Sequence, residues 1–461
     1  MIVFDTETRI SPPQRLTFGG YRCIIDSQCV EEGLFHGGGL SSQEIATLKR
    51  YVARYRPLGV VRSSALLLLP LRKFLDEYLY KDFYKARCLL VAFNHPFDLS
   101  RIANEFTTAR RRYAGGFSLG LWTYKDKNGL VRRHPYRPRV AIKHIDSKRA
   151  LIGFTGRQEP DTEDLIPEGS PTGKPEEDYI FRGHFLDLRT LAFALTDRGH
   201  SLESACEEFQ VEHPKKPVSE HGKVTKKYID YNRRDVLATT ELATKLLEEY
   251  GKHNISTQVT KVFSPASIGK GYLRDMGIRP VLQRQPNFPK KYLGYAQSAF
   301  YGGRTSAHIR KVPVPIVYTD FLSMYPTVNS LMGLWRFVTA RRIKVVKGCD
   351  REIRTFLSKL SMTDLFERKT WKELHAFVRV IPDNDLLPCR SKFNLESNDW
   401  QVAVNYLSAG SKKRADALWF SLPDVIVSNL LTGKVPRIVD AFRIEPEESY
   451  RDSSQSDCAV P

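Results

Sequence analysis

Four carboxylates occur at positions where they could share a metal-dependent active site. Asp5 and Glu7 follow the apolar residues 1–4, and because alternate residues of a strand share a face, both can point at one site. Asp98 ends the segment FNHPFD, and Asp235 ends YNRRD. Hydrolysis of a phosphodiester needs an activated water and neutralised phosphate charge, which two divalent ions roughly 3.5 to 4 Å apart supply. Because Mg²⁺ and Mn²⁺ prefer carboxylate oxygens, we expect these four acids to hold the ions.

Three further residues lie beside these acids. Tyr231 precedes Asp235 by four positions on a predicted helix, so both project from one face and the phenol would orient the attacking water. Asn94 precedes the helix that Pro96 begins, so it would cap that helix or contact the substrate backbone. Phe97 is the second residue of this segment that we expect to contact substrate.

The alternative interpretation is that each acid is a solvated surface residue, which is the usual state of a single carboxylate. The metal site is favoured because three segments each place an acid beside apolar strand or helix residues. Asp187, in FLDLRTL, is another candidate acid. We interpret it as a strand-end residue that holds a turn, because four ligand positions are already filled.

A second feature, YTDFLSMYP, predicts part of a nucleotidyl-transfer site. Asp320 ends the predicted strand at residues 316–321, and Ser323 and Tyr325 follow it. Such chemistry needs a metal-binding Asp, groups that bind the triphosphate, and an aromatic platform under the incoming sugar. An ordinary strand-to-helix turn is the alternative.

The segment FYGGR precedes this feature. Tyr301, Gly302 and Gly303 would contact a nucleic-acid backbone, since glycines allow close approach to phosphates. A plain hairpin turn is the alternative.

The elements around these residues predict an α/β fold for the first half of the chain. We expect strands at residues 1–4, 88–93, 140–145 and 185–188, and helices at 42–55, 71–84 and 228–250. The stretch 156–178 is rich in Glu, Asp, Pro and Gly and is predicted to be a surface loop.

The domain organisation follows from changes in composition. Residues 1–250 form the first domain, and the Pro- and Gly-spotted residues 251–315 form a connecting region. A second domain covers residues 316–445, and the Ser-rich residues 446–461 are predicted to be disordered.

The composition points to a nucleic-acid partner. The 461 residues include 71 Lys and Arg against 52 Asp and Glu, a net charge of +19. A folded chain with such a positive field attracts polyanions. Three clusters of basic residues each lie next to a tyrosine in the sequence: Arg110–Arg112 before Tyr113, Arg132 and Arg133 before Tyr136, and Lys226 and Lys227 before Tyr228. Grooves that hold single strands share this pattern, although a charge cluster is more often a solvated face.

The compartment is predicted from the cysteines and the hydropathy. The seven cysteines form no CxxC pair and no Cys/His cluster with zinc spacing, so free thiols are expected. The longest apolar run is too short to cross a bilayer, and the N-terminus lacks the features of a signal peptide. We expect a cytoplasmic protein.

The acidic motifs resemble those of a known family. FDTET, AFNHPFD and YNRRD resemble the three exonuclease motifs of the DEDD group, in the variant with Tyr in the third motif, as in the proofreading domain of family-B DNA polymerases. The segment SLESACEEFQVEHPKK resembles that family's link to its last helix. The resemblance implies an RNase H-like fold for residues 1–250 and 3′→5′ removal of nucleotides.

The second feature resembles the same family. YTDFLSMYP matches motif A of these polymerases, where Asp320 would bind both metals and Tyr325 would exclude a ribose 2′-hydroxyl. FYGGR resembles the YxGG segment, with Phe300 where that motif has Tyr. The nucleotide-gripping helix and the Asp-Thr-Asp hairpin that should follow are missing, and we interpret Asp383-Asn384-Asp385 as a β-turn.

We therefore expect a family-B DNA polymerase that is present as its exonuclease domain and an incomplete α+β palm, as a truncated reading frame or a fragment. The expected partners are DNA with single-stranded 3′ ends or as primer-template, and deoxynucleotides only if a complete palm exists. The alternatives are a stand-alone exonuclease of repair or defence and a non-catalytic DNA-binding protein.

Overall fold

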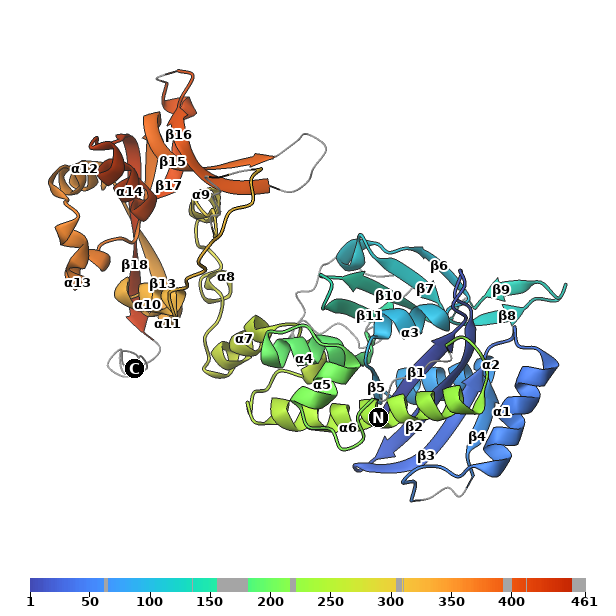
Figure 1. Cartoon of the computed structure of the whole chain (residues 1–461). Helices are drawn as coiled ribbons and strands as arrows, with labels where there is room; N and C mark the ends of the chain where they lie inside the picture. Colours follow the sequence, from blue (N-terminus) through green and yellow to red (C-terminus); the bar gives the residue numbers. More distant parts are fainter. Residues whose placement is uncertain are drawn as a thin grey trace. The chain divides into compact units, whose positions relative to one another are not determined.

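The chain divides into two compact units, Met1–Met276 and Gly277–Pro461, which are described separately (Figure 1). The computed structural model describes residues 1–61, 65–134, 136–155, 181–215, 221–303, 309, 311–392, 400–411 and 413–449. The loop predicted at 156–178, Arg304 and residues 450–461 of the predicted tail lie outside this part. The disorder predicted for residues 446–449 is wrong, because these residues end a long strand that pairs with residues 340–347. The connecting region predicted at 251–315 is divided between the two units. Among the described helices, none has the length and apolar character of a membrane span.

A six-stranded sheet is the centre of the first unit, with the strand order β12-β5-β1-β2-β3-β4. β1, β2 and β3 form an antiparallel meander, whereas β5 runs parallel to β1 and β12 runs parallel to β5. The strands are β1 (Ile2–Thr8), β2 (Leu16–Ile25), β3 (Gln28–His36), β4 (Leu67–Pro70), β5 (Leu89–Ala92) and β12 (His184–Asp187). The mixed α/β fold and the strands predicted at 1–4, 88–93 and 185–188 are confirmed.

A smaller antiparallel sheet of the same unit has the order β11-β10-β7-β6. Its strands are β6 (Glu105–Thr108), β7 (Phe117–Gly120), β10 (Arg139–His144) and β11 (Ala150–Thr155), so the strand predicted at 140–145 is confirmed. A separate two-stranded hairpin, β8 (Thr123–Lys125) and β9 (Val131–Arg133), is inserted between β7 and β10.

The helices of the first unit include the three that the periodicity predicts. They are α1 (Ser42–Arg54), α2 (Leu71–Phe74), the π-helix η1 (Leu75–Lys85), α3 (His95–Arg101), η2 (Arg111–Tyr113), α4 (Leu188–Thr196), α5 (Leu202–Glu208), α6 (Lys226–Gly251), η4 (Val259–Lys261) and α7 (Pro265–Asp275). Ser41 and Glu44 form a capping box at α1, which explains where that helix begins.

The two faces of the central sheet pack against different partners. Ile2 and Phe4 of β1 belong to a core formed with α2, η1 and the smaller sheet. Val3 points to the opposite face and packs with apolar residues of α4, α5 and α6. Because side chains alternate along a strand, Asp5 and Glu7 continue the face of Val3 toward α6.

The second unit contains an antiparallel sheet in the order β13-β18-β14-β17 and the hairpin β15–β16. Its strands are β13 (Ala340–Lys347), β14 (Ala376–Ile381), β15 (Asp383–Lys392), β16 (Trp400–Ser408), β17 (Leu418–Ser421) and β18 (Arg437–Ser449). Its helices are α8 (Val281–Arg284), α9 (Lys290–Ser298), α10 (Met324–Leu331), α11 (Trp335–Thr339), α12 (Asp350–Lys359), η5 (Thr363–Phe366), α13 (Arg368–Trp371), η6 (Arg414–Asp416) and α14 (Leu422–Thr432). α12 and α14 pack on one face of the sheet, and α9 packs on the other.

Candidate functional site

Strand β1 brings Asp5 and Glu7 to the side of the sheet that α6 covers. Asn232 of α6 is fully buried, and its Nδ2 donates to Asp5 Oδ2 at 2.8 Å and to Glu7 Oε1 at 3.4 Å. One amide nitrogen therefore joins the two carboxylates. Gly20, which pairs with Asp5 across β1 and β2, makes this approach possible, because a Cβ there would lie 2.5 Å from Asn232 Oδ1.

A stripe of polar residues along α6 faces these two acids. Tyr228, Tyr231, Asn232 and Asp235 recur at the three- and four-residue spacing that shares one side of a helix. The hydroxyl of Tyr228 donates to Glu7 Oε2. The ring of Tyr231 stacks on that of Tyr228, with centroids 5.8 Å apart and planes 10° apart. The stripe thus places aromatic rings and an amide around the carboxylates.

Asp98 reaches the end of β1 from helix α3. Its Oδ1 accepts the Thr6 backbone N–H at 3.1 Å and the Thr6 hydroxyl at 2.7 Å, and the residue is 2% exposed. Asn94 takes the N-cap position of α3, but its side chain makes no capping hydrogen bond. The guanidinium of Arg101 lies over the ring of Phe97, 4.8 Å from its centroid. Thr6 therefore ties Asp98 to the strand that carries Asp5 and Glu7.

Asp235 is held beside Tyr231 by a lysine from outside the helix. Lys215 Nζ lies 3.4 Å from Asp235 Oδ2 and 5.4 Å from the centre of the Tyr231 ring. Asp235 is 4% exposed, and its other oxygen, Oδ1, is buried without a hydrogen-bond partner. A buried carboxylate oxygen of this kind can bind a cation or a water.

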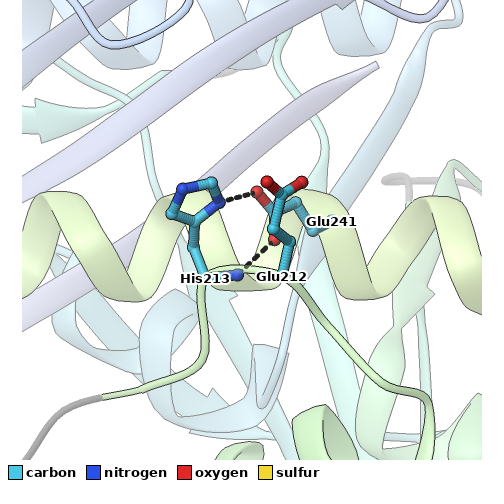
Figure 2. A group of neighbouring side chains, drawn as sticks. All are labelled: Glu212, His213 and Glu241. Atoms are coloured by element: carbon cyan, nitrogen blue, oxygen red, sulfur yellow. Dashed lines mark hydrogen bonds and ion pairs between the residues drawn. The ribbon is translucent and has the colours of Figure 1, made fainter.

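The segment that carries Lys215 is itself fixed to α6. His213 donates its backbone N–H to Glu241 Oε2 at 2.9 Å, and its Nδ1 lies 2.7 Å from Glu241 Oε1 (Figure 2). Arg234 Nε donates to the carbonyl of Pro214 at 3.2 Å. These contacts hold residues 213–215 along the helix, so that Lys215 can reach Asp235.

The His213 cluster is also a tight group of potential metal ligands. The ligand atoms of Glu212, His213 and Glu241 all lie within 4.8 Å of one another. Among the described residues, the four predicted acids do not form such a close group. His213 already contacts both oxygens of Glu241. We therefore interpret the cluster as a structural clamp.

Burial raises the pKa values of the four acids, and repulsion by neighbouring carboxylates adds to this effect at Asp5 and Glu7. Desolvation, followed by the charges of Asp98, Glu7 and Asp235, raises the pKa of Asp5 well above its usual value. Desolvation raises the pKa of Glu7 to about 7, although the hydrogen bond from Tyr228 acts in the opposite direction.

The two remaining acids shift in the same direction. Desolvation raises the pKa of Asp98 to about 7 against the hydrogen bonds from Thr6. The pKa of Asp235 is raised by desolvation and lowered by Lys215 and Tyr231. Three buried carboxylates, those of Glu7, Asp98 and Asp235, and the half-buried Asp5 have one lysine, Lys215, beside them, so acidic groups outnumber basic groups in the site. Their oxygen donors suit a hard divalent cation such as Mg²⁺ or Mn²⁺.

Several of these contacts were absent from the sequence prediction. Lys215, Tyr228, Asn232 and Thr6 all touch the predicted acids. The helical spacing from Asp235 back to Asn232 and Tyr228 could have identified two of them. Lys215 lies outside any helix or strand, so no periodicity indicated its place.

Asp187 makes the structural contacts that were predicted for it. It is the N-cap of α4, and its Oδ1 accepts the Thr190 backbone N–H at 2.8 Å. Its Oδ2 accepts the His95 backbone N–H at 2.8 Å, which links the starts of α3 and α4.

The strand predicted at 316–321 is wrong. Residues 313–321 have no assigned secondary structure, and Asp320 is exposed. Pro313 and Pro315 lack backbone donors, and the sheet of this unit is built from other segments. Ser323 is the left-handed N-cap residue of α10, with φ 56°, and Tyr325 is 67% exposed.

The glycines of FYGGR lie beside this segment. A Cβ on Gly303 would be 3.6 Å from the hydroxyl of Tyr325, and Gly302 has a positive φ of 71° that favours glycine. The guanidinium of Arg390 lies 4.9 Å from the centre of the Tyr301 ring, and the Phe420 ring stacks on Tyr301 with centroids 6.2 Å apart. Gly303 and Tyr325 are therefore neighbours in this unit.

The β-turn predicted at Asp383-Asn384-Asp385 is also wrong. These residues begin strand β15, where the register shifts between Asp383 and Asp385 and Asn384 has a φ of 56°. Asp385 is fully buried and lies 3.6 Å from Lys434 Nζ. The left-handed residue forms a bulge in the strand, not a turn.

Comparisons with known proteins relate part of the chain to DNA polymerases. Residues 198–341 match the family described as DNA polymerase type B, organellar and viral. This range contains Tyr231, Asp235, Asp320 and Tyr325, and it excludes Asp5, Glu7 and Asp98. The chain therefore contains a family-B DNA polymerase-like region.

The other comparisons give weaker likenesses. The solved structure titled "Phi29 DNA polymerase complexed with single-stranded DNA" aligns at 12% identity and a TM-score of 0.33. The alignment covers 97% of this chain and 61% of that chain, so this protein spans less than two thirds of its length. No match was found among curated proteins.

Proposed function

We propose that this chain is an enzyme related to family-B DNA polymerases and that its first unit removes nucleotides from the 3′ ends of DNA. One observation carries the proposal: Asn232 joins Asp5 and Glu7 through one amide nitrogen, on the helix that also carries Asp235. The order β12-β5-β1-β2-β3, an antiparallel meander continued by parallel strands, supports an RNase H-like fold. The family match over residues 198–341 supports DNA as the substrate.

Each acid has a place in the proposed reaction. Asp5, Glu7, Asp98 and Asp235 would hold Mg²⁺ or Mn²⁺, which when bound supply charge neutralisation and an acidified water. The Tyr231 phenol lies beside Asp235 and would orient the attacking water. The water oxygen forms a bond to phosphorus while the bond to the 3′ oxygen of the preceding nucleotide breaks, releasing a nucleoside 5′-monophosphate.

The residues around the acids have positioning roles in this proposal. Tyr228 and Asn232 are neutral donors, so they fix the Glu7 and Asp5 carboxylates without cancelling the charge that attracts a cation. Lys215 partly offsets the charge of Asp235. Asn94 and Phe97, at the start of α3, would contact the DNA strand.

We propose a more limited role for the second unit. Tyr301, Gly302, Gly303, Ser323 and Tyr325 would form a DNA- or nucleotide-contacting surface around Asp320. We expect no polymerisation by this chain unless the missing motifs are supplied from elsewhere, because Asp320 is exposed and the sequence contains no Asp-Thr-Asp segment. The exposure of Asp320 favours the second candidate function, a stand-alone 3′→5′ exonuclease.

A nuclease assay on the full chain tests the proposal. Single-stranded DNA labelled at its 5′ end should shorten progressively with Mg²⁺ or Mn²⁺, and the Asp5→Ala and Asp235→Ala variants should lose this activity. Glu248→Ala, which changes an exposed acid on the same helix, is the matched control. Unchanged activity in either site variant would overturn the assignment.

A further inference from the structure

Almost half of the protein's net charge comes from one short region of the first unit. Residues 104–149 contain twelve Lys and Arg against three Asp and Glu, a net charge of +9 out of +19 for the whole chain. These residues form β6, β7 and β10 and the β8–β9 hairpin. The region lies between the segments that carry Asp98 and Asp235, but it contributes none of the four acids.

The three acids of this region are each engaged by an arginine of the same region. Glu105 pairs with Arg139, Asp126 with Arg132 at 3.0 Å, and Asp146 with Arg149 at 2.6 Å. Arg137 also pairs with Asp76 of η1, outside the region. The region itself supplies only three acids for its twelve cations. Lys125 and Lys127, on the β8–β9 hairpin, are exposed to solvent.

The hairpin also carries a row of aromatic rings. Tyr124 pairs across the hairpin with Arg132, and its ring lies 6.1 Å from that of His134. The His134 ring lies 6.3 Å from that of Tyr136. Tyr124 is 38% exposed and Tyr136 is 86% exposed. Tyr124 and Tyr136 therefore expose their rings on a segment that also carries Lys125 and Lys127.

The hairpin projects from the rest of the first unit. Figure 1 shows β8 and β9 extending outward beyond β6 and β7. The hairpin forms its own two-stranded sheet and joins neither of the larger sheets. Its exposed tyrosines therefore contribute little to the core.

We propose that the β8–β9 hairpin, with Tyr136, binds single-stranded nucleic acid. Lys125 and Lys127 would contact phosphates, and Tyr124 and Tyr136 would stack on bases. A single strand fits better than a duplex, because only unpaired bases offer their faces to aromatic side chains. The inference rests on the proposed function only in naming DNA as the natural strand, because this binding requires neither divalent ions nor the four acids.

Fluorescence anisotropy with the full chain in EDTA tests this inference separately from the nuclease. The probe is a labelled oligo(dT), compared with a duplex of equal length. The Tyr124→Ala/Tyr136→Ala variant should raise the Kd for oligo(dT) roughly tenfold and change duplex binding less. The control is Tyr272→Ala, an exposed tyrosine of α7 in the same unit.

A second variant tests the contribution of charge to binding. It also keeps the proposal testable if the tyrosine variant does not fold. Lys125→Ala/Lys127→Ala should weaken binding and lower the slope of log K against log salt by about 0.7 for each lost phosphate contact. An unchanged Kd and slope in folded variants would overturn the proposal, as would equal losses for duplex and single strand. A wild-type chain that binds oligo(dT) through these residues but lacks nuclease activity would refute the proposed function alone.

Discussion

The two candidate sites of this chain, the four acids of the first unit and the segment around Asp320, differ in how far other elements surround them. Glu7, Asp98 and Asp235 are each less than 10% exposed, and tyrosine, threonine or lysine side chains contact them. The segment around Asp320 is open, with Val317 and Tyr318 each 89% exposed. The comparison shows that acids in a sequence motif form an enclosed site only where side chains from distant elements supply hydrogen-bond donors or a positive charge to them.

The difference has a physical origin in the partners of each segment. β1 lies inside a six-stranded sheet with a long helix packed on the face that carries its acids. Residues 313–321 pair with no described strand, and the prolines at 313 and 315 remove donors from one edge.

The largest expected effect compares Asp98 with Asp320. Asp98→Ala should reduce exonuclease activity by roughly 10³-fold or more. Catalytic residues that act together are not additive, so the loss of one of them removes most of the rate enhancement. Asp320→Ala should leave this activity within about twofold, a range that corresponds to less than 0.5 kcal/mol. The measurement is the initial rate on 5′-labelled single-stranded DNA.

Primer extension with the wild-type chain sharpens the same comparison. We expect no incorporation of deoxynucleotides on a primer-template. Extension that disappears in Asp320→Ala would show that the open segment is an active site, and the contrast between the two regions would then be wrong.

The sequence predicted the parts of the site that depend on local geometry. The alternation at Asp5 and Glu7, the Pro96 helix start before Asp98, and the apolar stripe of α6 each follow from a short spacing. The mixed α/β fold followed in the same way. These features depend on neighbours within a few residues.

The rest could not be predicted because it depends on long-range contacts. Lys215 reaches Asp235 because His213 is bound to Glu241, 28 residues away. Residues 316–321 have the apolar composition of a strand, yet a strand needs a partner that composition does not reveal. The composition of Asp383-Asn384-Asp385 is typical of a turn. Only the pairing of this segment with β16 makes Asn384 the residue of a bulge.

A smaller effect is expected from the amide that joins Asp5 and Glu7. Asn232→Ala should weaken Mn²⁺ binding about 10- to 100-fold, because outer residues that orient metal ligands contribute this much. Gly20→Ala should act similarly, since its Cβ would lie 2.5 Å from Asn232 Oδ1. Isothermal titration of Mn²⁺ into each variant measures the affinity without DNA.

The matched control for these variants is Thr240→Ala. Thr240 is a buried polar residue of α6 whose hydroxyl donates to the backbone carbonyl of Val236 at 2.7 Å. Thr240→Ala should retain wild-type Mn²⁺ affinity. If Asn232→Ala and Thr240→Ala bind Mn²⁺ equally, the amide is a structural residue only.

The smallest expected effect is a pH-dependent change in the melting temperature. The pKa of Glu7 and that of Asp98 are each raised to about 7 in the folded chain, so the folded state binds protons more tightly than the unfolded state. The metal-free protein should therefore lose stability as the pH rises from about 4 to about 7. A divalent cation that binds the ionised acids should restore it, so Mg²⁺ should raise the Tm more at pH 8 than at pH 5.5.

Differential scanning calorimetry at both pH values, with and without Mg²⁺, measures this effect. The expected shift is a few degrees, since about 1 kcal/mol moves the Tm of a unit of this size by roughly 2 to 4 °C. Glu7→Gln/Asp98→Asn should remove the difference between the two pH values, whereas Asp320→Asn, at an exposed position, should preserve it. An identical Mg²⁺ effect in all three proteins would mean that the buried acids do not bind the cation, which would remove the basis for distinguishing the two regions.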